Sequence, residues 1–190
     1  MNEDLVSVIM PAFNSERYIV ESIESILNQT YRNIELLITD DGSEDNTISI
    51  IKSYAQKDSR VKAFFLKGNT GAGSARNNSI KHAKGRYIAF CDSDDVWLPE
   101  KLEKQIRFMQ EKNCCFAFAS YYVFDSESRK KGIVLAPSSV SLIDTKRDDK
   151  IGFLTAVYDT SFYGKFYMPT LRKRQDWAYV LQILQKCGHA

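Results

Sequence analysis

The sequence has no excess of either charge and no long hydrophobic run. Its 26 Lys and Arg residues stand against 24 Asp and Glu residues, which leaves a net charge of +2. A balance of this kind produces no field strong enough to make nucleic acid the expected partner. No apolar run approaches the ~20 residues that a membrane-spanning helix needs. The composition therefore predicts neither a nucleic-acid-binding protein nor a membrane-spanning one.

Cysteine is also scarce, with four residues in 190. Their positions, Cys91, Cys114, Cys115 and Cys187, have neither the spacing of a zinc site nor the density of a disulfide framework. The first residues of the chain include acids where a signal peptide would be basic. We therefore expect small buried thiols in a reducing compartment, and a protein that starts in the cytoplasm.

The first part of the chain alternates between short apolar runs and amphipathic segments. Strands are predicted at residues 5–10, 34–39, 61–66 and 87–91. Helices are predicted after Ser15 as a cap, at 47–56, from 71 to 83 with Gly85 as a left-handed cap, and from Pro99 to 111. Strands that are apolar throughout are buried on both faces, so the pattern predicts an α/β fold with a mostly parallel sheet flanked by helices.

The pattern changes after residue 115. Strands are predicted at 116–124, 132–136 and 154–158, a loop at 138–150, a turn at 163–165 and an amphipathic helix at 176–186. We expect a single domain with two parts. Residues 1–115 form an α/β half that binds a nucleotide, and residues 116–190 form an irregular region that binds the second substrate.

The unusual polar residues follow the predicted strands at their carboxyl ends, where open α/β sheets bind ligands. The strongest signal is Asp92-Ser93-Asp94-Asp95 after the fourth strand. Close carboxylates repel each other, and Mg²⁺ or Mn²⁺ converts that repulsion into attraction with phosphate oxygens completing the shell. The alternative is an ordinary turn, because Asp and Ser also fill loops and cap helices.

Two further loops have the same alternatives. Asp40-Asp41-Gly42 follows the second strand, where an acid can bind a base or a ribose, although Gly42 and its neighbours also suit a plain turn. A glycine-rich loop at residues 68–77 opens a helix, and with Arg76 it favours a phosphate. It lacks the ending of a P-loop and the third glycine of a dinucleotide fingerprint, and an ordinary helix start is the other interpretation.

These segments together resemble the inverting family 2 glycosyltransferases with the GT-A (Rossmann-like) fold. The matching pieces begin at Val6, at Glu35, at Gly68 and, with the letters RKRQDW, at Arg172. The resemblance implies an inverting hexosyltransferase that moves a sugar from a nucleotide diphosphate donor, a UDP-sugar, to an acceptor hydroxyl. It also implies a saccharide or lipid-linked saccharide acceptor and a role in polysaccharide biosynthesis.

The resemblance also assigns roles to individual residues. Asp41 is expected to bind uracil, and Asp92-Ser93-Asp94 is the expected DXD motif, with Asp94 on the Mn²⁺ or Mg²⁺ ion and Asp92 on the ribose or the metal. The expected nucleotide pocket consists of Pro11, Ala12, Asn14, Glu16, Asp41, Asn69, Gly71, Arg76, Asp92 and Ser93. Trp97 and Trp177 are candidates for stacking on a sugar, with core or rim packing as the alternative.

Asp176 is the expected catalytic base, which accepts the proton of the attacking hydroxyl. The family usually has Glu before this Asp, and this chain has Gln175. Relatives generally continue for tens of residues beyond the point where this sequence stops. We therefore expect a missing C-terminal segment, through which the protein would associate peripherally with the inner face of the membrane.

Two other functions compete with this interpretation. The sequence Asp92-x-Asp94 after an apolar strand also resembles the nucleophile motif of haloacid-dehalogenase phosphatases, in which Asp92 would be phosphorylated. A shortened chain that binds a nucleotide sugar without turning it over is the second alternative. Transfer that depends on a nucleotide sugar would distinguish the three functions.

Overall fold

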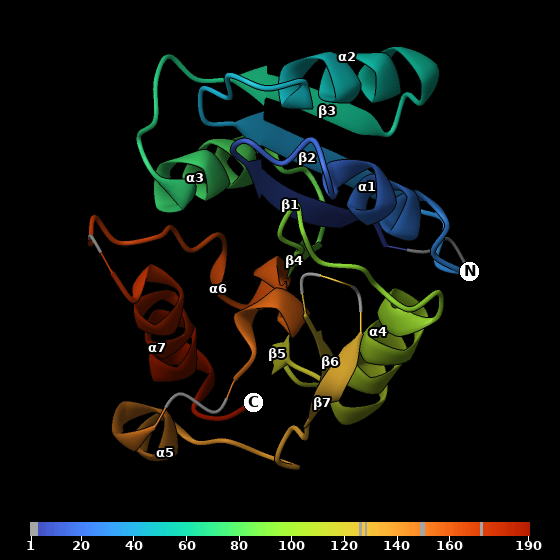
Figure 1. Cartoon of the computed structure of the whole chain (residues 1–190). Helices are drawn as coiled ribbons and strands as arrows, with labels where there is room; N and C mark the ends of the chain where they lie inside the picture. The colour runs from blue at the N-terminus through green and yellow to red at the C-terminus, as the bar shows by residue number, and fades with distance from the viewer. Residues whose placement is uncertain (1–3, 126, 128, 149–150, 172) are drawn as a thin grey trace.

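The centre of the molecule is a six-stranded sheet with the strand order β3-β2-β1-β4-β8-β5 (Figure 1). The structure, a computed structural model, describes residues 4–125, 127, 129–148, 151–171 and 173–190. The strands of this sheet are β1 (Val6–Ala12), β2 (Ile34–Asp40), β3 (Val61–Phe65), β4 (Tyr87–Phe90), β5 (Phe116–Ala117) and β8 (Val157–Asp159).

The sheet is mostly parallel, as predicted. β1 pairs in parallel with β2 and β4, and β2 pairs in parallel with β3. β8 is antiparallel to both of its neighbours, β4 and β5. Every residue of β1, β2 and β4 is buried, whereas β3 at the edge is partly exposed. Burial on both faces explains why the inner strands are apolar throughout.

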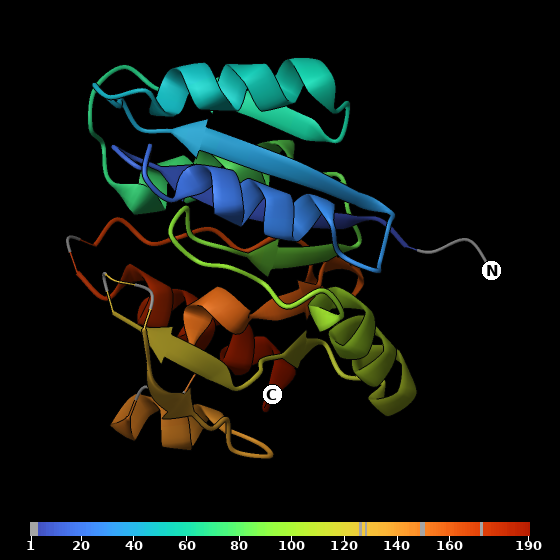
Figure 2. The same cartoon turned by 45° about the vertical axis from the view of Figure 1, so that its right-hand side comes forward.

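Helices cover both faces of the sheet (Figures 1 and 2). Successive residues of a strand point to opposite faces, so Val8 and Met10 enter one core cluster and Ile9 enters the other. The first cluster takes residues from α1 (Ile19–Leu27), α2 (Thr47–Lys57) and α4 (Lys101–Lys112). The second takes residues from α3 (Ala72–His82) and α7 (Gln175–Cys187).

The second part of the chain contains a separate hairpin and a short helix, which lie far from α2 in both cartoon views (Figures 1 and 2). The hairpin pairs β6 (Tyr121–Phe124) with β7 (Lys130–Val134). The short elements are α5 (Leu142–Arg147), the 3-10 turn η1 (Phe153–Thr155) and α6 (Thr160–Tyr163).

The structure corrects three predictions in this part. The strand predicted at 154–158 is the 3-10 turn η1 followed by the short strand β8. The single strand predicted at 116–124 is two strands, β5 and β6, which belong to different sheets. The loop predicted at 138–150 contains α5, and residues 149–150 lie outside the described residues. The Ser141 hydroxyl accepts from the Asp144 N–H, and the Asp144 carboxylate accepts from the Ser141 N–H. This capping box stabilises the start of α5, although the polar composition of the segment had predicted a loop.

Three local predictions in the first part were also wrong. The strand predicted at residues 5–10, before Pro11, continues to Ala12. Pro11 lies within β1, opposite Thr39 of β2 and beyond the last residue paired with β4, where its missing N–H costs less. Ser15 does not cap α1 with its side chain, which donates instead to the Phe13 carbonyl. Gly85 is not a left-handed cap, because it lies outside the positive-φ region. A Cβ at Gly85 would lie 2.6 Å from the Ser7 nitrogen and 2.7 Å from the Leu5 oxygen, so close packing requires the glycine.

The cysteines differ in part from the expectation. Cys115, directly before β5, and Cys187, the last residue of α7, form a disulfide, whereas Cys91 and Cys114 are free. The pair is 72 residues apart in sequence, and only the fold brings it together. Burial raises the pKa of the Cys91 thiol well above its usual value, as expected of an inert buried cysteine. Within the described part of the chain, no helix has both the length and the apolar character to span a bilayer.

Candidate active site

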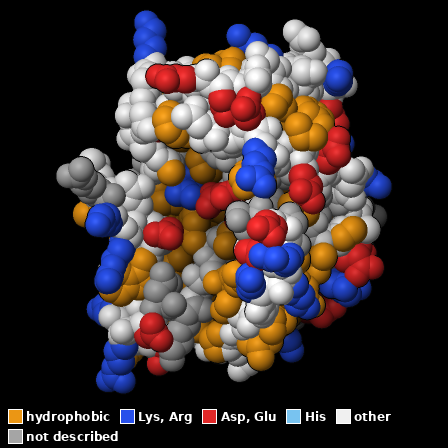
Figure 3. Space-filling model, in the orientation of Figure 1, with side chains coloured by type: hydrophobic (Ala, Val, Ile, Leu, Met, Phe, Trp, Pro, Cys, Tyr) orange, Lys and Arg blue, Asp and Glu red, His pale blue; other side chains and the backbone are white. Residues whose placement is uncertain are grey.

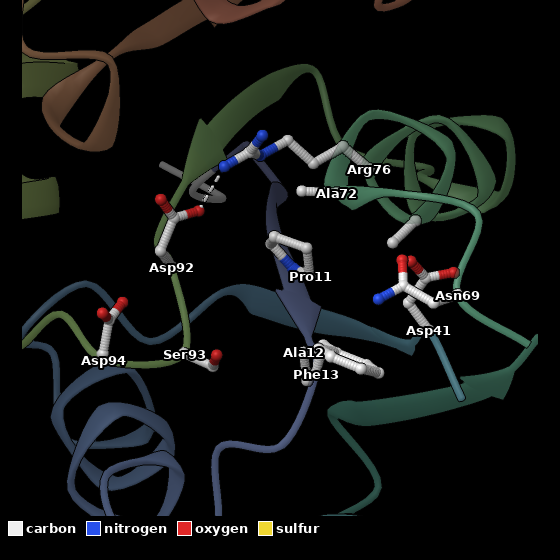
Figure 4. Close-up of a pocket in the computed structure, with 11 residues that line it drawn as sticks. Pro11, Ala12, Phe13, Asp41, Asn69, Ala72, Arg76, Asp92, Ser93 and Asp94 are labelled. Carbon is white, nitrogen blue, oxygen red and sulfur yellow. Dashed lines mark hydrogen bonds and ion pairs between the residues drawn. The ribbon is translucent and has the colours of Figure 1, made fainter. Parts of the chain in front are cut away.

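Loops from four parallel strands meet in one cleft at the carboxyl edge of the sheet (Figure 4). We call it the strand-end cleft, and its volume is about 290 Å³. It is lined by Pro11, Ala12, Phe13, Asp41, Asn69, Ala72, Ala75, Arg76, Asp92, Ser93 and Asp94. Most of the residues expected to bind a nucleotide therefore lie together, although they are separated by up to about 80 positions in sequence.

The turn after β2 is built by Asp40, which was not among the residues expected to bind the nucleotide. Its buried carboxylate accepts from the backbone N–H groups of Gly42 and Ser43 and from the Ser43 hydroxyl. Gly42 has a φ of 85°, and a Cβ there would lie 2.9 Å from the Gly68 backbone. The turn thus needs glycine both for its conformation and for the close approach of the next loop.

Asp41 connects this turn to the glycine-rich loop. Its carboxylate accepts from the Thr70 N–H at 2.9 Å, from the Thr70 hydroxyl at 2.7 Å and from the Gly71 N–H at 2.6 Å. Figure 4 shows Asp41 beside Asn69 at one end of the cleft. Gly71 precedes α3 with a φ of 95°. Three hydrogen bonds to one carboxylate fix the position of the loop that begins this helix.

Arg76 and Asp92 form an ion pair at the other end of the cleft. An Arg76 Nη atom donates to the Asp92 carboxylate at 2.6 Å (Figure 4). The guanidinium also lies over the Phe153 ring, 5.3 Å from its centroid, and its Nε–H is buried without a partner. Arg76 is 9% exposed, so this cation is held in place rather than solvated.

The acidic loop after β4 presents two carboxylates, Asp92 and Asp94, to the cleft. Asp95 is mostly buried, and burial followed by the negative charges of Asp92 and Asp94 raises its pKa to about 7. Ser93 shares a hydrogen bond of 2.7 Å with the Ser15 hydroxyl, which joins this loop to the one after β1. The loop therefore concentrates negative charge on one wall of the cleft.

Carboxylate oxygens are the ligands that Mg²⁺ and Mn²⁺ prefer. No group of three or more His, Cys, Asp or Glu side chains that would hold a metal by itself occurs among the described residues. The donor set of Asp92 and Asp94 fits a cation whose remaining ligands are phosphate oxygens and waters.

Three expected pocket residues, Asn14, Glu16 and Gly71, do not line the cleft. Gly71 donates its N–H to the Asp41 carboxylate, whereas Asn14 and Glu16 hold the rim of the cleft together. The Asn14 side chain accepts from the Glu44 N–H, and the Asn14 N–H donates to the Ser43 hydroxyl. The Glu16 carboxylate accepts from the N–H and the side-chain amide of Asn46. Both residues join the loop after β1 to the turn after β2.

A second cleft lies between the hairpin, η1 and the start of α7. We call it the hairpin cleft, and its volume is about 690 Å³. It is lined by Asp92, Tyr121, Val134, Leu135, Ala136, Pro137, Ile151, Gly152, Phe153, Leu154 and Asp176. Figure 3 shows this face of the molecule hollowed near its centre, with hydrophobic side chains in the hollow and charged side chains at its upper end. Asp92 lines both clefts, so they meet at this residue.

Asp176 lies in the first turn of α7, and the residue before it contacts α3. The space that a Cβ at Gly73 would need is occupied by the Gln175 side-chain amide, which also donates to the Leu171 carbonyl. Gln175 therefore packs the start of α7 against the start of α3. Arg172, the first residue of the RKRQDW segment, lies outside the described residues.

Neither tryptophan lines a cleft. Trp97 is 5% exposed and belongs to the core cluster on the α1 and α4 side of the sheet. The Trp177 indole N–H donates to the Thr145 carbonyl of α5 at 2.8 Å. The aromatic residues that do line the clefts, Phe13, Tyr121 and Phe153, were not selected from the sequence. Phe13 had a signal, because it lies between Ala12 and Asn14, which were both expected in the nucleotide pocket, but Tyr121 and Phe153 had none.

Sequence comparison identifies close relatives of this chain. The profile described as Glycosyl transferase family 2 matches residues 7–172. The chain is 40% identical over 183 residues to the putative teichuronic acid biosynthesis glycosyltransferase TuaG of Bacillus subtilis, which covers 96% of this chain and 73% of that protein. It is 40% identical over 185 residues to the UDP-Glc:alpha-D-GlcNAc-diphosphoundecaprenol beta-1,3-glucosyltransferase WfgD of Escherichia coli, covering 97% and 72% of the two chains.

Solved structures with the same fold include TarS of S. aureus. Residues 1–349 of TarS in complex with UDP match this structure with a TM-score of 0.78 at 26% identity, over 95% of this chain and 55% of the TarS chain. The complex of the same TarS fragment with UDP-GlcNAc gives a TM-score of 0.73. The chain thus spans about half the length of these solved structures.

Proposed function

The chain is a member of glycosyl transferase family 2 with the GT-A fold, and on that premise we propose that it transfers a hexose from a UDP-sugar to an acceptor hydroxyl with inversion. The observation that carries this proposal is the strand-end cleft. It brings Asp41 from the turn after β2, Arg76 from α3 and Asp94 from the loop after β4 to one edge of the sheet. Asp41 can accept hydrogen bonds from a nucleotide, Arg76 can bind a diphosphate, and Asp94 can bind a metal ion.

The nucleotide diphosphate is proposed to lie along the strand-end cleft from Asp41 to Asp92. α3 has no acid in its first turn, so the positive end of its dipole favours phosphate, and Arg76 adds a fixed positive charge. Asp41 is proposed to bind uracil, and Asn69 is proposed to lie near the ribose and the diphosphate. TarS, a structural relative, has been solved with UDP and with UDP-GlcNAc, which supports UDP as the nucleotide. Pro11 and Ala12 add apolar surface to the cleft between its two ends (Figure 4).

Asp94, with Asp92 beside it, is proposed to hold Mg²⁺ or Mn²⁺. A cation bound there supplies positive charge that stabilises the leaving diphosphate. Arg76 is proposed to stabilise the negative charge of the same diphosphate, because it lies against Asp92 at the point where the two clefts meet. The diphosphate is therefore proposed to leave on the side of the clefts that carries the acidic loop.

Asp176 is proposed to be the general base. As the acceptor oxygen forms its bond to the anomeric carbon, its proton passes to the Asp176 carboxylate. The bond from the anomeric carbon to the diphosphate oxygen breaks, and its electron pair leaves with the diphosphate. Attack opposite to the leaving group in a single displacement inverts the anomeric centre, by analogy with inverting glycoside hydrolysis.

The acceptor is proposed to be a saccharide, free or linked to a lipid. The name of WfgD describes a diphosphoundecaprenol-linked GlcNAc acceptor, and that relative is 40% identical to this chain. A location in the cytoplasm, with peripheral attachment to the inner face of the membrane, stays a prediction. The phosphatase alternative based on Asp92 was wrong, because the chain belongs to another family.

Calorimetry with UDP, with and without Mn²⁺, tests the proposal together with an assay for UDP release from UDP-sugars. We expect UDP to bind, to bind more tightly with Mn²⁺, and to be released from at least one UDP-sugar in the presence of a saccharide acceptor. Binding without turnover would favour the non-catalytic alternative. If neither UDP nor any other nucleoside diphosphate binds with either metal, the proposal is wrong.

A further inference from the structure

The lining of the hairpin cleft combines two carboxylates with an apolar wall. The carboxylates are those of Asp92, in the loop after β4, and Asp176, in the first turn of α7, whereas the chain from Val134 to Pro137 supplies the apolar wall. Leu135 in this wall is 72% exposed, which is a high value for an apolar side chain. The volume of about 690 Å³ lies within the ~300–1,000 Å³ typical of small-molecule sites. A ligand with hydroxyl groups at one end and apolar surface at the other matches this cleft.

Two aromatic rings line the hairpin cleft within the described residues, and they differ in their freedom to contact a ligand. Phe153 is 8% exposed, packs against Phe90 and Tyr179, and lies under the Arg76 guanidinium. Tyr121 is only half-buried. It is therefore the aromatic side chain in this cleft that can offer surface to a ligand.

Gly152 holds the Tyr121 ring in its position. A Cβ on Gly152 would lie 2.5 Å from Cε1 and 2.9 Å from Cδ1 of Tyr121, so one edge of the ring rests on the glycine. Gly152 has a φ of −64°, which any residue adopts, so backbone conformation does not explain the glycine. The contact does, because an added methyl group would push the ring out of place.

We propose that Tyr121, seated on Gly152, is the platform on which the acceptor pyranose ring stacks. This inference rests on the proposed function and names the part of the acceptor that the site recognises. The C–H face of a hexopyranose is apolar and packs on an aromatic ring, while its hydroxyl groups point outward. A sugar on Tyr121 has its free hydroxyls toward Asp176 and its aglycone along the wall at Leu135.

Saturation-transfer NMR with methyl and octyl hexopyranosides, on protein saturated with UDP and Mn²⁺, tests the platform. The methyl glycosides of glucose, galactose, mannose and N-acetylglucosamine report on the ring alone, and the octyl glycosides add an apolar aglycone. We expect at least one methyl glycoside to bind, Tyr121→Ala to weaken it about tenfold or more, and Tyr121→Phe to change it less than about threefold. Gly152→Ala is expected to weaken it as well, although it removes no group from the cleft.

Matched controls separate this effect from unfolding. Tyr122→Ala removes an exposed ring from the same strand, and Gly132→Ala adds a methyl group where nothing lies within 4 Å. Both are expected to bind the glycosides as the wild type does. Leu135→Ser is expected to weaken only the octyl series.

The outcomes distinguish the two proposals. A protein that does not bind UDP contradicts the proposed function. A protein that binds UDP but no methyl hexopyranoside, or binds it equally well after Tyr121→Ala, contradicts the platform and leaves the proposed function standing. Loss of UDP affinity in Tyr121→Ala would also count against the platform, since the ring lines only the hairpin cleft.

Discussion

Asp176 is the residue on which the proposed chemistry most depends. Asp176→Asn keeps the size of the side chain and removes its capacity to accept the proton of the acceptor hydroxyl. General-base catalysis typically contributes ~10²–10⁴-fold. We expect sugar transfer to fall by about 100-fold or more while calorimetry gives an unchanged affinity for UDP. Glu111→Gln, an exposed change at the end of α4, is the control and should leave both unchanged. Transfer at the wild-type rate by Asp176→Asn would show that another group takes the proton.

Lys101 is a buried amine at the start of α4. Its Nζ lies 3.9 Å from the centroid of the Trp97 ring and has no hydrogen-bond partner, and the Trp97 indole N–H is also without one. Burial lowers the pKa of Lys101 to about 7, from ~10.4 in an unfolded chain. Between these two pKa values the unfolded chain binds more protons than the folded chain, so Lys101 makes the free energy of unfolding rise with pH. Below pH 7 the amine is charged in both states, and the full cost of burying that charge lowers the free energy of unfolding.

We therefore expect Lys101→Met to raise the free energy of unfolding by about 1–3 kcal/mol at pH 6, the usual cost of a buried unsatisfied donor, and by less at pH 9. Urea denaturation at both pH values measures the difference. Lys104→Met, on the exposed face of the same helix, is the comparison and should show no such dependence on pH. A gain for Lys101→Met that is equal at the two pH values would contradict the assigned cause.

At the scale of elements, β4 is joined to β1 by a very close approach at Gly85. Gly85→Ala places a methyl group 2.6–2.7 Å from backbone atoms of residues 5 and 7, which cannot move without disturbing the central strand. We expect a loss of about 1–3 kcal/mol in the free energy of unfolding, the usual cost of overpacking. Gly132→Ala in the hairpin has open space around it and should change stability by less than ~0.5 kcal/mol. Equal stabilities of the two variants would show that the strands adjust without strain.

The elements that the sequence predicts well are those with a continuous local signal. β1, β2, β4 and α7 were placed within one or two residues, because buried apolar strands and an amphipathic helix each show their own period. Whether β1 could continue through Pro11 depended on where its pairing with β4 ends, and the local sequence does not show this. The break between β5 and β6 depended on a change of sheet, which no local pattern shows.

The candidate site likewise contains residues that a local signal predicts and residues that only the fold brings into place. Asp41, Arg76 and Asp94 follow predicted strands, and the rule that parallel strands end at one edge was enough to bring them together. Trp97 and Trp177 were selected by residue type alone, and the fold uses one in the core and the other between helices. Tyr121 could not be identified, because its role depends on Gly152, more than 30 residues further along the chain.

At the scale of the whole molecule, ligand binding in the strand-end cleft should stabilise the fold. A ligand that binds only the folded state adds about 2.7 kcal/mol at 100 times its dissociation constant. We expect UDP with Mn²⁺ to raise the melting temperature by several degrees, and excess EDTA to remove most of that shift. In Asp94→Ala, we expect UDP to give only the small rise in melting temperature that the wild type shows with EDTA, at every Mn²⁺ concentration. A shift in Asp94→Ala as large as in the wild type would contradict the assigned ligand.

A shared wall also has a thermodynamic consequence. Since Asp92 belongs to both clefts, whatever reorients its side chain in one alters the shape and charge of the other. Occupancy of the two sites is then linked, and linkage is reciprocal: UDP must change glycoside affinity by the same factor by which the glycoside changes UDP affinity. Titrations performed in both orders would measure that factor, and a value of one would mean that the two sites fill independently.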